Sequence, residues 1–483
     1  MPGHFSEAIT LMQASAVYLG SVSGRVLSTL PTVVSAVTPP IYNHLREIMF
    51  RTSQVIKERL LQNTHEFAEK KEPVVVVPVL ERLEFYAVGA LWAVLALFQL
   101  IAFWFWNAKK YFARKKRDKP APNCLTDSSL GTHSYIKLKG AKLHYVEAGD
   151  RNQPLMICLH GFLDCWIGWR FQIPTMAQNF RIVAVDLKGY GDSEKPLSRG
   201  KYEIEQVVEE LAEFITAVAA DRKDQKCVLV GHDVGALVGW FLVYSHPELI
   251  SRFVSISCPH PNVFWNLLES TALFNKKMVQ QSQFPEIMER CLMLNDLAII
   301  DSVHSHVQAH PNSGVVSKET YKFVFSRKMD WTGALNYYRT LWKARINPEL
   351  VGKLDVPLLL IVGDREQSFS LETAIRSTEL EPKLVVRVVN GAGHAPHQEA
   401  VPQVNKLLLT FLAVTDSQPG FRISAMKSSI VEPEQNGIVN RMIGALNSTY
   451  SFGNQMLEQV TRKKDPLALP YRTRGCNTQL APR

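Results

Sequence analysis

Short apolar runs alternate with helical stretches between about residues 130 and 415. The connectors, such as 202–220, carry apolar residues at helical spacing. Ahead of the runs, 135–148 alternates like an antiparallel edge hairpin, whereas 259–346 breaks the alternation and is mainly helical. This pattern predicts an α/β fold, a doubly wound, mostly parallel sheet into which a helical cap is inserted. Continuous apolar runs are typical of strands that are buried on both faces of a sheet. The runs of this kind are 155–160, 181–186, 227–232, 252–257, 357–362 and 384–389.

An uncharged stretch precedes this domain, at residues 86–106. Gln99 is its only strongly polar side chain, and about 20 apolar residues span a hydrocarbon core of roughly 30 Å. Trp92, Trp104 and Trp106 lie towards its ends, as interfacial anchors do. We therefore predict one transmembrane helix; the alternative, a buried core helix, is disfavoured because such helices rarely lack charge over so many turns.

The positions of the Lys and Arg residues predict the orientation of this helix and argue against nucleic acid as a partner. Lys and Arg number 54 against 45 Asp and Glu, and the excess lies in 107–120 and 416–483. Seven Lys or Arg follow the helix within 109–119, whereas 66–85 holds three. The positive-inside rule then predicts that residues 107–483 are cytosolic and that the N-terminus lies across the membrane. Seven scattered cysteines without a metal or disulfide spacing fit a reducing compartment.

These patterns divide the 483 residues into five parts. Residues 41–61 show helical spacing of apolar residues, which predicts an amphipathic helix before the anchor. The glycosylation sequon at Asn447 lies on the predicted cytosolic side and stays unused. The predicted parts are an N-terminal extension (1–85), a transmembrane helix (86–106), a basic linker (107–130), an α/β domain (131–415) with its cap at about 259–346, and a mostly disordered tail (416–483).

A candidate nucleophile lies between a strand and a helix. Gly231-His232-Asp233-Val234-Gly235 follows an apolar run directly and precedes a helical stretch. A tight strand-to-helix turn needs small residues near its apex, and it exposes its central residue above the sheet edge. A carboxylate at that point can attack an electrophilic carbon and form an ester. The alternative is an ordinary turn, because Gly and Asp are common in turns.

An acid and a histidine follow Asp233 in the chain order of a nucleophile–acid–histidine triad. Gly363-Asp364-Arg365-Glu366 ends one predicted strand, and Gly391-Ala392-Gly393-His394 ends the last. His394 can take a proton from water while a carboxylate orients its imidazole. Asp364 and Glu366 compete for that role, and we favour Glu366 because a residue farther from the strand reaches the histidine more easily.

Two backbone N–H groups, those of Phe162 and Val234, are predicted to hold the ester oxygen of Asp233. Phe162 belongs to His160-Gly161-Phe162, at the end of a predicted strand, and Val234 follows the nucleophile. The segment 186–193 lacks the glycine count of a dinucleotide-binding loop, so we expect a structural turn there. Neither a cofactor nor a metal is expected.

Several of these segments, in the same order, resemble the epoxide hydrolases of the α/β-hydrolase superfamily. The resemblance covers about 130–415 and is greatest to members with an N-terminal membrane anchor and a cytosolic catalytic domain. It implies a small apolar epoxide as substrate, Asp233 as nucleophile, Glu366 and His394 as the rest of the triad, and Tyr338 as a cap acid that protonates the epoxide oxygen. The matching segments are HGFLDCWIGWR (160–170), VDLKGYGDSEKP (185–196), GHDVGALVGW (231–240), NYYR (336–339), GDRE (363–366) and GHAPHQEAVPQVNKLLLTFL (393–412).

The chain also departs from the family pattern. Asn275 stands where a second cap tyrosine is common, and Leu163, Val234 and Ala395 replace a proline, a tryptophan and an aromatic residue. The predicted function is a hydrolase anchored in the endoplasmic reticulum that opens epoxides, including lipid epoxides, to vicinal diols through an Asp ester. The alternatives are a catalytically idle membrane scaffold or lipid-binding protein, and a dehalogenase, which usually binds halide through the tryptophan that Val234 replaces.

Overall fold

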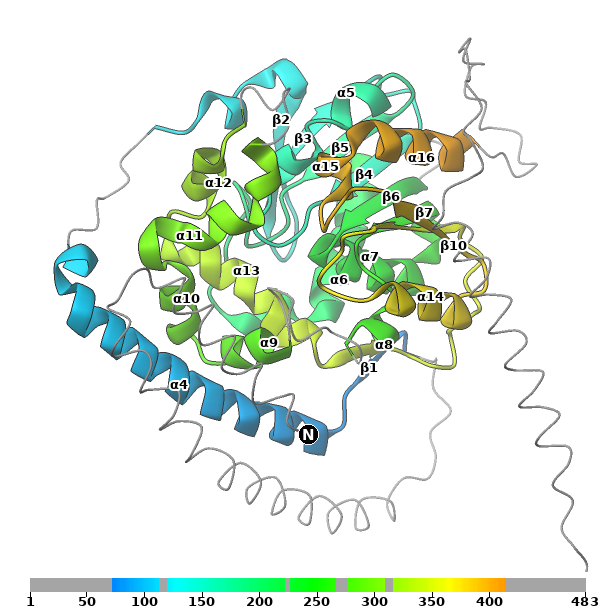
Figure 1. The fold of residues 1–483 in the computed structure, drawn as a ribbon. Helices are drawn as coiled ribbons and strands as arrows, with labels where there is room; N and C mark the ends of the chain where they lie inside the picture. Colours follow the sequence, from blue (N-terminus) through cyan, green and yellow to red (C-terminus); the bar gives the residue numbers. More distant parts are fainter. Residues whose placement is uncertain (1–71, 113–119, 222–225, 266–275, 309–315, 414–483) are drawn as a thin grey trace, which may run out of the picture. The chain divides into compact units, whose positions relative to one another are not determined.

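The computed structural model describes residues 72–112, 120–221, 226–265, 276–308 and 316–413 (Figure 1). The helix predicted at 41–61, the predicted disordered tail, Asn275 and Asn447 lie outside the described residues.

An eight-stranded sheet forms the centre of the α/β domain, in the order β10-β9-β7-β6-β4-β5-β3-β2. Its pairs are parallel except β2 with β3 and β3 with β5. Every residue of β4, β5 and β6 is buried, which explains why these strands are apolar without alternation. The predicted doubly wound, mostly parallel sheet with its edge hairpin is confirmed. The strands are β2 (Thr132–Lys137), β3 (Lys142–Ala148), β4 (Leu155–Leu159), β5 (Arg181–Val185), β6 (Cys227–His232), β7 (Ile250–Ile256), β9 (Leu358–Gly363) and β10 (Leu384–Val389).

Helices from the connectors flank this sheet (Figure 1). Residues Val234–Tyr244 of α7 are buried all round the helix, which makes it a central helix, whereas α6 buries one face at helical spacing. The described cysteines, six in number, are all unpaired thiols. The flanking helices are α5 (Ile173–Met176), α6 (Ile204–Val218), α7 (Val234–Ser245), α14 (Leu371–Leu380), α15 (Pro396–Glu399) and α16 (Val401–Ala413).

The insertion between β7 and β9 is a helical cap that ends in a short strand, β8 (Ala344–Ile346). β8 pairs in antiparallel fashion with β1 (Val74–Val76), a run of three β-branched residues that precedes the long N-terminal helix. Sequence analysis did not predict either strand, because each is short and is stabilised by a partner far away in the chain. The cap helices are α8 (Pro261–Phe264), α9 (Lys276–Ser282), α10 (Ile287–Leu292), α11 (Leu294–Val303), α12 (Lys318–Val324) and α13 (Lys328–Leu341).

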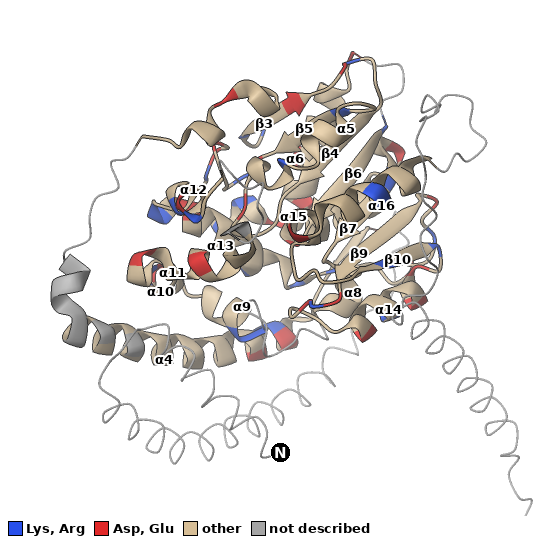
Figure 2. Cartoon of the chain, turned by 45° about the horizontal axis from the view of Figure 1, so that its top comes forward, with Lys and Arg blue, Asp and Glu red and all other residues tan. Residues whose placement is uncertain are grey.

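The predicted membrane segment lies within α4 (Val79–Phe112), a helix of 34 residues that is longer than the predicted 86–106. Its part Val79–Ala102 is long and apolar enough to cross a membrane. Figure 2 shows this helix largely free of charged residues in its middle, as the sequence requires. The predicted linker 107–130 therefore contains the last turns of α4 as well as two 3₁₀ turns, Asn123–Leu125 and Ser128–Leu130.

The pairing of β1 with β8 departs from one expectation. Residues Val74–Val76 were predicted to lie across a membrane from the α/β domain, whereas in the structure they form a two-stranded sheet with β8 of its cap. The positive-inside rule counts charges and takes no account of such a contact.

Candidate active site

Asp233 lies at the turn between β6 and α7, in a backbone conformation that is rare for residues other than glycine. Its φ is 47° and its ψ is −116°, and its N–H donates to the carbonyl of Ile256 at 3.0 Å. The turn is tight enough to exclude side chains on both sides. A Cβ at Gly231 would lie 2.5 Å from Ala236 Cα, and one at Gly235 would lie 2.5 Å from the carbonyl oxygen of Leu159. The two glycines of the motif are therefore required by the turn itself.

Phe162 reaches the carboxylate of Asp233 through its backbone. Its N–H donates to Asp233 Oδ2 at 2.9 Å. Val234 is the first residue of α7, so its N–H lies among the first N–H groups of the helix, which have no partner within it. Leu163, which stands where the family has proline, has a φ of 58°. Since a proline ring holds φ near −65°, a proline would not fit the backbone of this chain at position 163.

His394 lies between Glu366 and Asp233. Its Nδ1 is 2.8 Å from Glu366 Oε2, and its Nε2 is 4.0 Å from Asp233 Oδ1. Glu366 also accepts the backbone N–H groups of Gln367 and Ser368 at 2.9 and 2.8 Å, which hold the carboxylate in place. Asp364, the competing acid, is exposed and accepts the N–H of Gly391 at 2.7 Å. The geometry therefore pairs Glu366, and not Asp364, with the histidine.

The two carboxylates and the imidazole set one another's charge. Burial favours a higher pKa for Asp233, but His394, His232 and the Phe162 N–H together outweigh it and lower this pKa to about 2. Burial favours a lower pKa for His394, but Glu366 and Asp233 outweigh it and raise this pKa well above the usual value. Burial and His394 act in opposite directions on Glu366, and the net effect lowers its pKa. At neutral pH the site therefore holds two carboxylates around an imidazolium.

His232, the residue before the nucleophile, supports the site in a way that the sequence does not predict. It is buried, and its Nε2 lies 2.9 Å from the backbone carbonyl of His394. Burial and the nearby His394 charge lower the pKa of His232 to about 4, so the ring is neutral and its Nε2–H donates. This bond fixes the backbone that carries His394. Its only sequence signal was its position beside Asp233.

Asp164, His232 and His397 form a buried group whose possible ligand atoms lie within 4.8 Å of one another. Asp164 accepts the N–H of Cys165 and the side-chain amide of Gln398, each at 2.8 Å. These contacts, with the bond from His232 to the His394 backbone, describe a polar cluster behind the active site, and we assign no ion to it.

Tyr338 faces the same pocket from cap helix α13. It is buried, and its ring packs edge-on against Phe162 with 5.0 Å between ring centroids. Burial and the charge of Asp233 raise the pKa of Tyr338 well above its usual value, so its hydroxyl stays protonated. The pocket has about 10 Å³ of free volume, near the least that holds one water, so a larger substrate needs its walls to part. Its lining residues are Asp233, Phe264, Trp265, Val279, Tyr338, Ser368 and His394.

The neighbouring Tyr337 points elsewhere. Its ring centroid lies 5.7 Å from that of Tyr190 and 5.3 Å from that of Tyr202, and it does not line the pocket. Successive residues of a helix are about 100° apart around its axis, so adjacent tyrosines cannot share one target.

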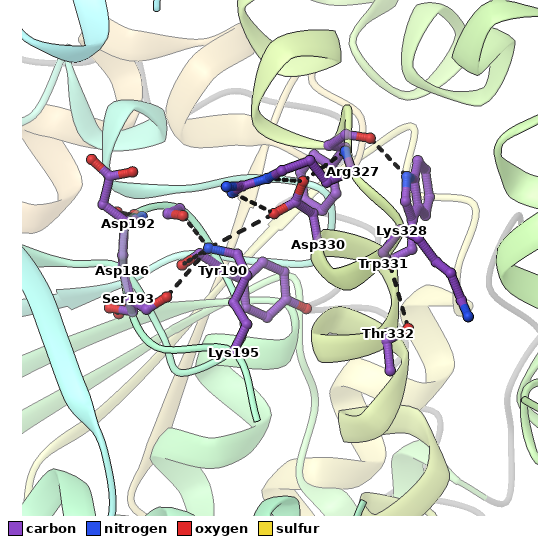
Figure 3. A network of polar contacts seen from close by, with 12 residues as sticks. Asp186, Tyr190, Asp192, Ser193, Lys195, Arg327, Lys328, Asp330, Trp331 and Thr332 are labelled. Carbon is purple, nitrogen blue, oxygen red and sulfur yellow. Dashed lines mark hydrogen bonds and ion pairs between the residues drawn. The ribbon is translucent and has the colours of Figure 1, made fainter. Parts of the chain in front are cut away.

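A polar network holds α13, and so Tyr338, against the turn after β5 (Figure 3). Asp330, buried in the first turn of α13, accepts from Arg327 Nη2 at 2.9 Å and lies 3.8 Å from Lys195 Nζ. Lys195 in turn donates to the carbonyls of Tyr190 and Ser193 at 3.3 and 3.2 Å. The segment predicted as a structural turn thus joins the sheet edge to the cap.

The strand order, the strained turn at Asp233 and the inserted cap together define an α/β hydrolase. A model of the alpha/beta hydrolase fold family matches residues 154–401. Epoxide hydrolase 4 of Homo sapiens is 32% identical over 316 residues, which cover 62% of this chain and 84% of that protein. Epoxide hydrolase 3 of Xenopus tropicalis is 32% identical over 306 residues, covering 61% and 81%.

An epoxide hydrolase structure from Vigna radiata covers 58% of this chain and 97% of its own, at 28% identity and a TM-score of 0.48. On the identity and coverage of its curated relatives, the chain belongs to the epoxide hydrolases of the α/β hydrolase fold family.

Proposed function

We propose that this protein hydrolyses epoxides to vicinal diols through an ester on Asp233. The observation that carries the proposal is the convergence of Asp233, the His394–Glu366 pair and Tyr338 on one small pocket. Each of the three supplies a group that the reaction needs: a nucleophile, a base and an acid. The names of the curated relatives support the same substrate class.

In the first step, Asp233 opens the ring. Phe162 holds Oδ2, so Oδ1, which faces His394 and the pocket, is the attacking oxygen. Oδ1 forms a bond to one ring carbon, the bond from that carbon to the epoxide oxygen breaks, and Tyr338 gives its proton to this oxygen. The low pKa of Asp233 keeps the carboxylate ionised for the attack.

In the second step, water cleaves the ester. Once Asp233 is esterified, one of the two charges that raise the pKa of His394 is gone, so this pKa falls. The imidazolium then gives its proton to the Tyr338 phenolate, and the neutral ring can act as a base. His394 takes a proton from water, whose oxygen attacks the ester carbon, while the N–H groups of Phe162 and Val234 stabilise the developing charge on Oδ2. The bond from the ester carbon to Oδ1 then breaks, the diol takes the proton from His394, and the second proton of the water passes from the new carboxyl group back to His394.

The surroundings of the site favour apolar substrates. Phe264, Trp265 and Val279 form the cap side of the pocket and offer no charged group. We also propose that the apolar helix α4 attaches the protein to the cytosolic face of a membrane, because the seven Lys or Arg of 109–119 suit the anionic lipids of that leaflet. Lipid epoxides, and the endoplasmic reticulum as location, are consistent with this attachment.

A single turnover in ¹⁸O-labelled water tests the mechanism. Because the oxygen added to the first product comes from Asp233, the first diol should contain no label and the peptide holding Asp233 should gain it. Full-length protein in excess over a panel of epoxides provides the sample, and mass spectrometry of diol and peptide provides the readout. Label in the first diol would show direct attack by water and contradict the ester.

Replacing Tyr338 by Phe is expected to slow ring opening about 10²–10⁴-fold, the usual contribution of general-acid catalysis. Stopped-flow or single-turnover measurement of ester formation follows this step directly. Tyr337→Phe is the matched control, because it removes a buried hydroxyl from the adjacent residue, away from the pocket. A loss below about threefold in Tyr338→Phe, or an equal loss in the control, would assign the proton to another donor.

A further inference from the structure

Both ends of α4 are joined to the α/β domain. Before the helix, β1 pairs with β8, and the N–H of Val77 donates to the carbonyl of Lys343 at 2.7 Å. After it, the chain is described again from residue 120 and packs on the cap, where Cys124 Sγ lies 3.5 Å from Thr320 Oγ1. A spanning helix separates its ends by a hydrocarbon layer of roughly 30 Å. One water-soluble domain cannot hold both ends of such a helix.

One face of α4 packs on the cap along several turns. Phe85 stacks on Trp342 with 3.7 Å between ring centroids, and a Cβ at Gly89 would lie 2.7 Å from the carbonyl oxygen of Gln280. The same face continues through buried Ala93 and Ala96, each 4% exposed. Small residues at this spacing let the helix approach α9 closely (Figure 1). Protein, and not lipid, therefore covers this side of the predicted membrane segment.

The opposite face of α4 is apolar and exposed. Exposed side chains recur every three or four residues, so they share one side of the helix. Phe98 is 65% exposed and Phe105 is 75% exposed, and Phe85–Ala108 carries no charge. A continuous apolar surface of this kind marks an interaction site. Its large residues are Leu83, Val94, Leu97, Phe98, Ile101, Trp104 and Phe105.

We propose that α4 lies flat in the surface of a lipid bilayer, with its exposed face among the acyl chains and its packed face on the cap. A helix held in this plane keeps both of its ends, and residues 1–78, on the side of the α/β domain. The sequence of 109–119 holds seven Lys or Arg, a composition that favours binding to a bilayer with anionic headgroups. The proposal rests on the proposed membrane attachment of α4 and is independent of the epoxide chemistry.

This orientation also places the pocket close to the bilayer. Helix α9 contacts α4 through Gln280 and contributes the adjacent Val279 to the pocket lining. One short cap helix thus separates the membrane-facing helix from the site.

Topology is tested on the full chain in microsomes. Val75 and Arg345 are paired across β1 and β8, and antiparallel partners have Cα atoms about 4.5–5.5 Å apart, within the range of a disulfide. Val75→Cys with Arg345→Cys should therefore cross-link under mild oxidation, whereas Val75→Cys with Arg387→Cys, on β10, should not. In parallel, His65→Ser makes Asn63 a glycosylation acceptor, which should stay unmodified. Glycosylation of Asn63, or no cross-link in the first pair, overturns the proposal in favour of a spanning helix.

The lipid contact is tested by flotation of the full chain with phosphatidylcholine–phosphatidylserine vesicles. Leu97→Glu with Ile101→Glu places two charges on the exposed face and should lower the bound fraction at least about tenfold. Leu197→Glu with Met329→Glu is the matched control, because these residues, 66% and 40% exposed, lie on other surfaces. Unchanged flotation of the first variant, or a wild type that does not float, overturns the proposal. Epoxide turnover of every variant in detergent is recorded separately, so its absence in the wild type counts against the proposed function alone.

Discussion

Replacing Asp233 by Asn is expected to lower epoxide turnover at least about a thousandfold while leaving the fold intact. The amide is nearly isosteric with the carboxylate, and its carbonyl oxygen, in the place of Asp233 Oδ2, can still accept the N–H of Phe162. It is, however, a poor nucleophile and carries no charge to hold the imidazolium of His394. Diol formation from the most active epoxide of the panel provides the rate, and thermal unfolding reports on the fold.

The matched control is Asp364→Asn. Asp364 is exposed and lies near the same loops, but it bonds to the Gly391 N–H and not to His394. It should retain activity within about twofold, as surface substitutions usually do. A freshly prepared Asp233→Asn protein with more than about a tenth of the wild-type rate, once deamidation back to Asp is excluded by mass, would refute the assignment of the nucleophile.

The second large effect concerns the intermediate. His394→Gln should allow Asp233 to attack but should block hydrolysis of the ester, since only the second step needs the imidazole as a base. The peptide that holds Asp233 should then be heavier by the full mass of the epoxide, because ring opening loses no atoms. A haloalkane would instead add only its alkyl group after halide leaves, which separates epoxide hydrolysis from dehalogenation.

The control for this experiment is the double variant Asp233→Asn and His394→Gln, which lacks the attacking oxygen and should gain no mass. An adduct on any other residue would place the nucleophile elsewhere. No adduct with any epoxide or haloalkane, together with an inactive wild type, would favour the idle-scaffold alternative. If the ester were hydrolysed faster in the His394→Gln variant than in the wild type, His394 would not be the base.

Much of the fold follows directly from the sequence. The strands β4, β5 and β6 are continuous apolar runs because both faces of a central parallel sheet are buried, and such runs are visible in the sequence. The turn at Asp233 can also be predicted from the local sequence. It has no room for a side chain at positions 231 and 235, so both positions are glycine, and this motif is visible in the sequence.

The choice of partner within the site required the tertiary structure. Asp364 and Glu366 are two residues apart in one loop, and only the loop's path shows that Glu366 reaches His394 while Asp364 turns towards Gly391. The separation of Tyr338 from Tyr337 likewise depends on how α13 is rotated against the sheet, which the contact of Asp330 with Lys195 helps to hold (Figure 3).

The sequence by itself determined that α4 is a long apolar helix, because composition and length alone decide whether a helix suits a membrane. It did not determine which side of that helix meets protein, since Phe85–Ala108 is uncharged all round, and the small residues Gly89, Ala93 and Ala96 do not by themselves show whether protein or lipid covers them. Only the pairing of β1 with β8 and the packing of Phe85 on Trp342 decided that, because both contacts join residues more than 250 positions apart. Contacts between residues so far apart in the chain depend on the folded shape of both partners, and the sequence of either segment alone does not predict them.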